Sequence, residues 1–535
     1  MPKIHGMKQF TVLFVFLVQS VAFSQINIQV HEARHAQLPG VQSFAFGIHQ
    51  GEWLIAGGRV DGLHRRQPWA SFQPEDNNTR LMVVNPVTGQ FWSAALDSFP
   101  VPLQEQLQST NMNFTQVGDD LFLAGGYGYA PSAGDHVTHP YLTVLRVPEV
   151  ITAVKTGLNP AGQFRYIADE RFRVTGGQMH YLDGWFYLMG GQQFMGRYNP
   201  IGPTHGPGFV QQYTDAVRKF TVQNTPDGLQ TGSFSEWVDS LQLHRRDFNA
   251  LPQVFPDGTR GFTMFSGVFR PDADLPWLNT VDVRPDGYAN REGFNQLLNQ
   301  YHTAHIALYD QAKSTMYAVF FGGISRYQLN AAGDLVDDPN VPFVRTISVV
   351  ERGPDGAMRE YQIGEMPDWL GAGAEFIPAI AEDRGIIMLN NLPQADSILI
   401  GYVYGGIQSV APNIFFTNEG DQSLASGRVF EVWWYPLAAV SVQLPPARLP
   451  DRNRLRVYPN PASGTTQAAF EAPIEERLRL VIYDQQGAVV RTVFNEVMAV
   501  GEYIYPIDMA GFPAGTYHFR LCNVNGICSE VRVVR

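Results

Sequence analysis

The sequence predicts an all-β protein, made of a large body of repeated sheets and a small β-sandwich at its C-terminal end. Three observations support this prediction. Short apolar runs that end in a glycine pair recur along most of the chain, alternating apolar and polar residues mark strands in the C-terminal segment, and a Pro-rich stretch separates the two parts. The 535 residues are too many for one simple layered core, so the length also favours a repeated architecture.

Residues 1–24 predict a signal peptide. Lys3 and Lys8 precede an apolar run from Phe10 to Phe23, and Ala22-Phe23-Ser24 forms a cleavage site of the small-x-small type. No later stretch approaches the roughly 18 continuous apolar residues that are needed to span a bilayer. We therefore expect cleavage after Ser24 and no transmembrane segment in the mature chain.

Residues 25–443 carry six copies of a strand-like apolar run that ends in a glycine pair or in a degenerate form of it. Each copy follows another β-rich run and a turn, and hairpins at long spacing are typical of radial β repeats. Glycine tolerates backbone conformations and close approaches that a Cβ would forbid near a crowded central channel. The copies are Trp53–Gly58, Leu121–Gly126, Phe186–Gly191, Phe262–Gly267, Ala318–Gly323 and Tyr402–Gly406.

This pattern resembles the kelch-type β-propeller, in which the glycine pair follows the second strand of each four-stranded blade. The resemblance implies a six-bladed propeller. Kelch repeats are about 50 residues long, whereas these glycine pairs lie 56 to 83 positions apart, so we expect long inserted loops. The opening strand Ile26–Val30 is expected to pair with Arg428–Trp434 and to close the ring of blades.

A Pro-rich segment at 444–451 predicts an extended linker after the propeller. The residues that follow it, 452–535, hold a Tyr-Pro-Asn-Pro motif, then an alternating strand from Leu478 to Asp484, then Phe512–Leu521. The order of these motifs resembles the type A C-terminal sorting domain of the bacterial type IX secretion system. The residues that carry the resemblance are Tyr458, Pro459, Asn460, Pro461, Gly515 and Tyr517.

The resemblance to a sorting domain implies an immunoglobulin-like β-sandwich and the type IX secretion machinery as a partner. It also implies export across the outer membrane, so that the mature protein is secreted or attached to the outer surface of that membrane. The alternative is a β-sandwich that is appended only for stability.

Cys522 and Cys528 are the two cysteines of the chain, and they flank Val524-Asn525-Gly526. A three-residue hairpin loop with Gly526 in the left-handed conformation would place the two cysteines opposite each other, which predicts a disulfide. A pair of free thiols is the alternative. Galactose oxidase and its relatives, the best-known kelch-type enzymes, need a cysteine cross-linked to a tyrosine at their copper site. Because the propeller has no cysteine, the sequence excludes a copper radical oxidase.

The composition and motifs exclude several further classes of protein. The net charge of −12 argues against nucleic acid as a partner, since phosphate binding needs a basic surface. The sequence contains no Gly-x-Ser-x-Gly elbow, no His-Glu-x-x-His helix and no phosphate-binding Gly-x-x-x-x-Gly-Lys loop. A glycosidase needs only two carboxylates on separate strands, so the absence of these motifs does not exclude an enzyme.

We expect no metal site and no cofactor. His136 and His139, and likewise His302 and His305, are three positions apart. On a strand, this spacing directs the two rings to opposite faces of the sheet. The expected role of these histidines is therefore a hydrogen bond to neighbouring backbone.

Aligning the repeats on their glycine pairs brings polar residues to one mouth of the central channel, just before each innermost strand. Arg246 belongs to one of two His-Arg-Arg sequences, which can bind carboxylates or instead pair with acids nearby. Polar residues of mixed charge beside aromatic side chains can bind a carbohydrate or a peptide, whereas a water-filled mouth is the alternative. The candidate ligand-binding residues are Gln42, Asn111, Thr175, Arg246, Asp247, His302 and Glu375.

These observations favour a non-catalytic module that binds carbohydrate or protein at or beyond the cell surface. One alternative is a hydrolase or lyase that acts on polysaccharide or peptide at the channel mouth. The other is a structural adhesin, whose outer loops matter and whose channel does not.

Overall fold

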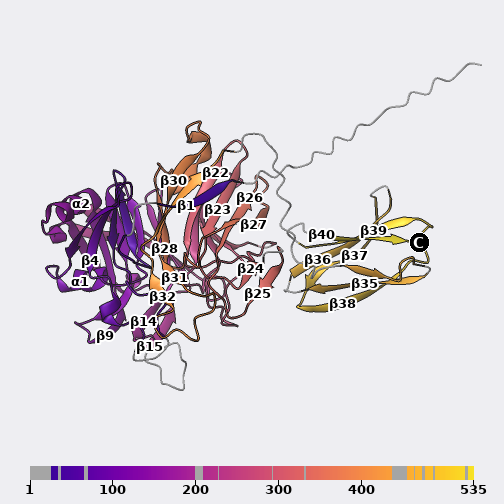
Figure 1. Cartoon of the computed structure of the whole chain (residues 1–535), viewed down its shortest axis with the longest axis horizontal. Coiled ribbons are helices and arrows are strands. Elements are labelled where there is room, and N and C mark those ends of the chain that lie inside the picture. Colours follow the sequence, from indigo (N-terminus) through magenta and orange to yellow (C-terminus); the bar gives the residue numbers. More distant parts are fainter. Residues whose placement is uncertain are drawn as a thin grey trace, which may run out of the picture.

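The computed structural model describes residues 26–33, 38–65, 70–198, 209–226, 228–291, 293–330, 333–436, 455–462, 464–472, 476–485, 488–523 and 528–535. The predicted signal peptide at 1–24 and the predicted linker at 444–451 lie outside these residues. The described elements are mostly strands, which confirms the all-β prediction (Figure 1). We call residues 26–436 the body and residues 455–535 the C-terminal module.

The first four large sheets of the body are antiparallel, and each one takes its four strands in chain order. The first sheet is β2 (Ala45–His49), β3 (Glu52–Ala56), β4 (Arg80–Asn85) and β5 (Gln90–Ala95). The second is β6 (Asn113–Val117), β7 (Asp120–Ala124), β10 (Tyr141–Arg146) and β11 (Phe164–Ala168). The third is β12 (Gln178–Leu182), β13 (Trp185–Met189), β16 (Ala216–Thr225) and β17 (Gly228–Val238). The fourth is β18 (Asn249–Val254), β19 (Arg260–Phe265), β20 (Val281–Arg284) and β21 (Gly287–Asn290).

The fifth and sixth sheets depart from this simple order. The fifth is β22 (Ala304–Asp310), β23 (Thr315–Phe321), β26 (Thr346–Arg352) and β27 (Met358–Glu365), with β29 (Ile386–Met388) added in parallel beside β22. The sixth is β28 (Ala374–Pro378), β30 (Ile398–Gly405), β33 (Val429–Trp434) and β1 (Ile28–Glu32). β1 pairs antiparallel with β33, so that Val30 lies opposite Val432. The predicted pairing of the opening strand with the last strand of the body is confirmed.

Each of the six large sheets carries an insertion between its second and third strands. The insertions of the second and third sheets pair with each other as one small sheet, while those of the fifth and sixth form two-stranded hairpins. The strands of these insertions are β8 (Tyr127–Ala130), β9 (Asp135–Thr138), β14 (Gln192–Gly196), β15 (Phe209–Tyr213), β24 (Tyr327–Leu329), β25 (Leu335–Asp337), β31 (Ile407–Ser409) and β32 (Ser423–Ala425). The long inserted loops that the spacing of the glycine pairs predicts are therefore present.

The described helices are short and lie between the strands. The two α-helices are α1 (Val101–Leu107) and α2 (Val147–Thr156). The 3-10 helices are η1 (Pro74–Asp76), η2 (Pro160–Gln163), η3 (Glu170–Phe172) and η5 (Leu389–Asn391). In the described part of the chain, no helix is long and apolar enough to cross a membrane.

Apolar side chains fill the space between neighbouring sheets, and this packing continues from the sixth sheet to the first. Trp53, which is 1% exposed, packs in one cluster with Tyr402 and Tyr404 of β30. The rings of Trp53 and Tyr402 are 5.3 Å apart in an edge-to-face arrangement, the geometry that aromatic pairs favour. The two ends of the body are thus joined both by strand pairing and by a buried core.

The glycine pairs lie where one sheet meets the next. Gly125 has a φ of +69°, and a Cβ there would overlap the carbonyl oxygen of Val174, which leads into the third sheet. Gly405, with a φ of +74°, meets the carbonyl of Val41 ahead of the first sheet in the same way. Because both the φ and the contact exclude a side chain, the predicted reason for these glycines is confirmed.

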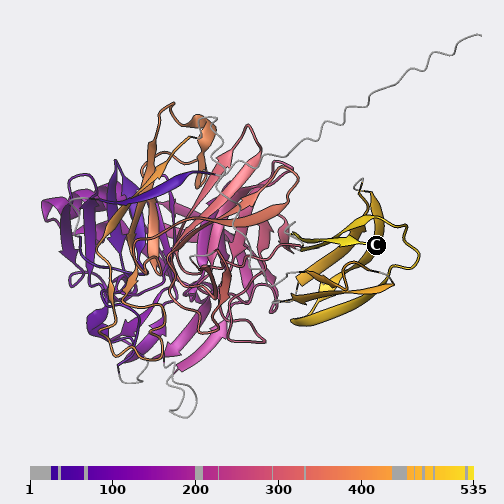
Figure 2. The same ribbon diagram turned by 45° about the vertical axis from the view of Figure 1, so that its right-hand side comes forward.

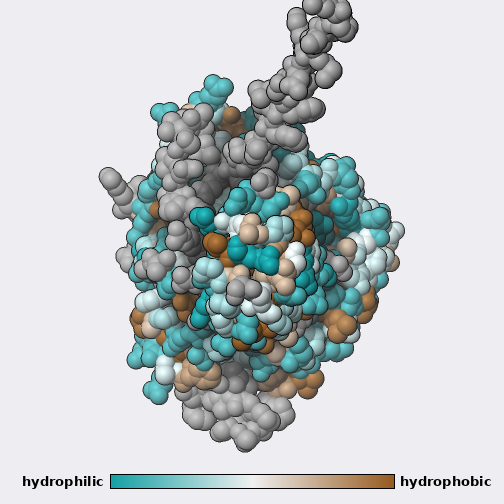
Figure 3. Space-filling model, turned by 90° about the vertical axis from the view of Figure 1, so that its right-hand side faces the viewer, coloured by the Kyte–Doolittle hydropathy of each residue, from teal (hydrophilic) through white to brown (hydrophobic). Residues whose placement is uncertain are grey.

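The C-terminal module is a sandwich of two sheets, drawn in yellow in Figures 1 and 2 as a unit separate from the body. One sheet is β34 (Arg456–Tyr458), β35 (Thr465–Ala472) and β38 (Gly501–Asp508). The other is β36 (Glu476–Tyr483), β37 (Val489–Met498), β39 (Thr516–Asn523) and β40 (Cys528–Val534). Leu480, Ile482 and Phe519 are fully buried between the two sheets. The described surface on the face seen in Figure 3 is mostly hydrophilic, with scattered apolar residues.

Cys522 is disulfide-bonded, and the pairing of β39 with β40 places it opposite Cys528. Thiol labelling of the unreduced, denatured full chain is therefore expected to find no free cysteine. A disulfide that closes so short a loop stabilises by on the order of 2 kcal/mol, so Cys522→Ser with Cys528→Ser should lower the unfolding midpoint of the module. Stoichiometric labelling of both thiols in the unreduced protein would contradict the disulfide.

Candidate functional site

A pocket of about 880 Å³ lies where the insertions of the sheets meet. Its outer walls come from residues that follow the second strand of each sheet, and its floor comes from the residues that precede the first strands β2, β6, β12, β18, β22 and β28. Aromatic side chains supply much of the lining, among them Phe72, Tyr127, Phe194, Tyr198, Tyr213 and Phe416. All six large sheets thus contribute to one site.

The floor of the pocket is a ring of six residues in the left-handed conformation, one from each large sheet. They precede the first strand of each sheet by one or two positions and have φ values of 48° to 66°. A positive φ is uncommon for residues other than glycine and often marks a functional position. The ring comprises Ser43, Asn111, Gly176, Asp247, His302 and Gly373.

Backbone hydrogen bonds connect the ring from sheet to sheet. Asn111 N donates to Ser43 O (3.1 Å), and Asp247 N donates to Gly176 O (2.7 Å). Ser43 N donates to Gly373 O (2.7 Å), which joins the first sheet to the sixth. Among the described residues, five of the six junctions of the ring carry such a bond, and the junction of Asp247 with His302 does not.

The structure brings together six of the seven residues predicted at this mouth. Gln42, Asn111, Thr175, Arg246, Asp247 and His302 all line the 880 Å³ pocket. Glu375 instead lies two positions beyond Gly373, on β28, where it lines a smaller pocket of about 40 Å³ that shares Ser43, Asn111, Asp247 and His302 with the large one. Burial raises the pKa of Glu375 to about 8. Glu375 thus does not line the large pocket and lies on the other side of the ring, beside the strands.

Arg246 is a largely buried cation surrounded by aromatic rings. Its side chain is 11% exposed, and its guanidinium lies 4.8 Å from the Phe269 ring and 5.8 Å from the Phe194 ring. Nη1 is 3.6 Å from Asp247 Oδ2, while the buried Nε has no hydrogen-bond partner among the described residues. Burial opposes the charge, but Asp247 and Tyr198 hold the pKa of Arg246 above its ordinary value.

The two His-Arg-Arg sequences have different roles. Arg245 is fully buried and donates hydrogen bonds to the carbonyls of Gln242, Ser266 and Asn279, so it supports the loop rather than a ligand. In the first sequence, His64 lines the pocket and stacks on Phe72, whereas Arg66 lies outside the described residues. Burial lowers the pKa of His64 to about 4, so this ring is neutral at pH 7.

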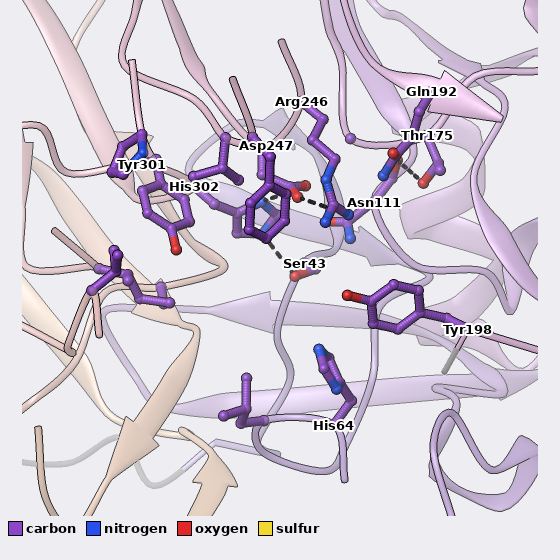
Figure 4. Close-up of a pocket in the computed structure, with 18 of the residues that line it drawn as sticks. Ser43, His64, Asn111, Thr175, Gln192, Tyr198, Arg246, Asp247, Tyr301 and His302 are labelled. Carbon is purple, nitrogen blue, oxygen red and sulfur yellow. Dashed lines mark hydrogen bonds and ion pairs between the residues drawn. The ribbon is translucent and has the colours of Figure 1, made fainter. Parts of the chain in front are cut away.

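Asp247, His302 and Ser43 form a continuous chain of side chains on the floor of the pocket (Figure 4). His302 Nδ1 is 3.5 Å from Asp247 Oδ1, and His302 Nε2 is 2.9 Å from Ser43 Oγ. Burial opposes the charge of Asp247, but the hydrogen bond from His302 and the charge of Arg246 hold its pKa below the usual value. The carboxylate therefore stays ionised beside the imidazole.

Sequence reasoning missed Ser43 because it aligned the repeats on their glycine pairs. That alignment selected Gln42, Thr175 and Arg246, which lie one position before the ring, together with Asn111, Asp247 and His302, which lie in it. Aligning on the start of the first strand of each sheet would have placed Ser43 at the position of the last three. Ser43 is the polar residue at the equivalent position of the first repeat.

Two of the four histidines weighed as metal ligands bond to backbone as expected, whereas the His302 ring faces the side chains of Ser43 and Asp247, and the buried His139 Nε2 has no hydrogen-bond partner among the described residues. His136 Nε2 lies 2.7 Å from the carbonyl oxygen of Phe72, and His305 Nδ1 lies 2.7 Å from that of Thr303. Across the described ranges, no group of three or more His, Cys, Asp or Glu side chains is arranged to hold a metal ion.

The predicted sorting motif is tied to the end of the chain. Asn460 Nδ2 donates to Arg532 O (2.7 Å), and Asn460 Oδ1 accepts from Val534 N (2.9 Å). Gly515 and Arg535 exchange two backbone hydrogen bonds, and the hydroxyl of the buried Tyr517 donates to Pro513 O (2.7 Å). The motif thus holds together the first and last strands of the C-terminal module.

Comparison with known proteins identifies this module. No curated protein matches the chain. A family model described as the secretion system C-terminal sorting domain matches residues 456–534. The chain therefore carries a type IX secretion C-terminal sorting domain and is exported by that system to the cell surface or the medium.

Proposed function

We propose that the body is a six-bladed, kelch-like β-propeller that binds an oligosaccharide in its 880 Å³ pocket outside the cell. Six successive large sheets, the pairing of β1 with β33 and the backbone hydrogen bonds between consecutive members of the ring at five of its six junctions support the propeller. The observation that carries the binding function is the pocket itself. It is one concave site, lined by aromatic rings and a few polar side chains from every blade.

The size and chemistry of the pocket favour a carbohydrate. Ligand sites are commonly 300–1,000 Å³ in volume and combine apolar walls with a few polar groups that fix the ligand. Aromatic faces pack against the C–H faces of sugar rings, while Arg246, Asn111 and Gln192 offer donors and acceptors to hydroxyl groups. A peptide ligand is the alternative outcome of the test below.

Arg246→Ala is expected to weaken oligosaccharide binding by about 1 to 3 kcal/mol, or roughly 5- to 150-fold, because a charge-assisted hydrogen bond is lost. The measurement is a glycan array with the purified full chain, followed by titration calorimetry on the glycans that bind. Arg80→Ala is the matched control, since Arg80 is an exposed arginine of β4 that does not line the pocket.

Phe416→Ala keeps the test decisive if Arg246→Ala fails to fold. Phe416 lines the pocket and is 70% exposed, so its removal should reduce affinity several-fold and leave thermal stability unchanged. Unchanged affinity of both variants for a glycan that the wild type binds would contradict the proposed site. If the chain binds peptides and no glycans, the proposed ligand class is wrong, whereas the proposed site is retained.

A further inference from the structure

We propose that Ser43, His302 and Asp247 form a nucleophile, base and carboxylate that hydrolyse a carboxylic ester carried by the bound ligand. This inference rests on the proposed pocket and goes beyond binding. The observation behind it is that residues from three different sheets, far apart in the chain, meet in line at the floor of one cavity. The substrate class is an O-acylated carbohydrate, whose sugar part occupies the aromatic pocket.

The carboxylate, the imidazole and the hydroxyl lie in the order that acyl transfer needs. The carboxylate faces Nδ1 of the imidazole and the hydroxyl faces Nε2, so the base can take a proton from the nucleophile while the carboxylate stabilises the resulting cation. The 2.9 Å contact of His302 with Ser43 is a hydrogen bond. The 3.5 Å contact with Asp247 is longer, as such contacts often are before substrate binds.

Two glycines of the ring make room for this arrangement. A Cβ on Gly373 would lie 2.7 Å from Ser43 Oγ, and a Cβ on Gly176 would lie 2.8 Å from Asp247 Oδ1. Gly373 separates His302 from Ser43 in the ring, so a side chain there would crowd the hydroxyl that His302 reaches. The floor of the pocket is therefore open beside Ser43, His302 and Asp247, which we call the relay.

The proton of Ser43 has two acceptors within reach. Gln42 Oε1 is 2.6 Å from Ser43 Oγ, and Gln42 Nε2 donates to Gly62 O (3.2 Å), which turns the amide oxygen toward the hydroxyl. A serine hydroxyl rotates between acceptors. The Asp247 carboxylate favours the tautomer that carries its proton on Nδ1, which leaves Nε2 free to accept the proton of Ser43.

The reaction balances with water as the only co-reactant. Ser43 Oγ forms a bond to the ester carbonyl carbon as its proton passes to His302 Nε2. The bond from that carbon to the sugar oxygen then breaks, and the sugar leaves as an alcohol with the proton from Nε2. Water attacks the acyl-serine by the same route, which releases the carboxylic acid and restores Ser43.

Asn111 is the candidate donor to the oxyanion of the intermediate. It is next to Ser43 in the ring, and its side-chain amide has no hydrogen-bond partner in the part of the chain that the structure describes. A donor aimed at the developing charge typically contributes a factor of about 10² to 10³ to the rate. Asn111→Asp, which keeps the shape and tolerates the positive φ, is expected to lower the rate by that factor.

The test uses the purified full chain with p-nitrophenyl acetate and with O-acetylated xylan, and a fluorophosphonate probe to label the nucleophile. Ser43→Gly removes the hydroxyl and accepts the φ of 54°, so the fold is retained. We expect acetate release to fall at least about 100-fold in Ser43→Gly and His302→Asn, and mass spectrometry to find the probe on Ser43. Ser93→Gly, on β5, is the matched control and should retain full activity.

The outcomes separate this inference from the proposed binding function. Ser43→Gly that binds glycans normally but releases no acetate supports the relay. Acetate release that persists in Ser43→Gly overturns it. A wild-type chain that binds glycans but shows neither acetate release nor a labelled Ser43 also overturns the relay and leaves the binding function intact.

Discussion

Deletion of residues 452–535 is expected to abolish export and to leave the folded body in the periplasm. The family match at 456–534 assigns this segment to type IX secretion, and its strands form their own sandwich. The buried apolar cluster of the C-terminal module contains no described residue of the body. Removing the module therefore uncovers no core of the body, and the loss of export should not come from unfolding.

Fractionation of cells that express the truncated chain measures this prediction. The protein should disappear from the medium and the outer surface and should appear in the periplasm, where limited proteolysis tests whether it is folded. Full-length Phe416→Ala is the control, because it changes an exposed residue of the body and should be exported normally. Normal surface or medium levels of the truncated chain would show that residues 452–535 are not the export signal.

Local sequence signals predict the strands well, because strand pairs and their turns are short-range features. The apolar runs before the glycine pairs coincide with second strands of sheets, for example β7 at Asp120–Ala124 and β13 at Trp185–Met189. The glycine pairs are predictable for the same reason, since a positive φ and a close backbone contact both demand glycine.

Contacts between insertions that lie far apart in the chain cannot be predicted from local sequence signals, unlike the strands themselves. β9 pairs with β14, so that Val137 lies opposite Met195, although the two strands belong to the insertions of different sheets. Nothing in either segment specifies the other. The same limit applies to the relay, because the approach of His302 to Ser43 depends on a ring of left-handed residues that only the folded backbone brings together.

Arg352→Ala is expected to lower the free energy of unfolding of the body by about 3 to 5 kcal/mol. Arg352 of β26 is 3% exposed and binds Asp282 of β20 through two hydrogen bonds, of 2.6 and 2.8 Å. The same guanidinium donates to Thr263 Oγ1 of β19 (3.0 Å). The contact thus joins the fourth and fifth sheets, and the variant leaves the Asp282 carboxylate buried without its counter-charge.

Urea denaturation of the full chain, monitored by tryptophan fluorescence, measures the effect, because all nine tryptophans of the sequence belong to the body. The exposed Arg80→Ala should stay within about 0.5 kcal/mol of wild type. Combining Arg352→Met with Asp282→Asn removes both charges and keeps an acceptor for the Thr263 hydroxyl, which donates to Asp282 Oδ1 (2.6 Å). This pair should recover most of the lost stability, because the main cost of Arg352→Ala is the unpaired carboxylate. If the double variant is as unstable as Arg352→Ala, the attraction and packing of the ion pair itself stabilise the junction of the two sheets.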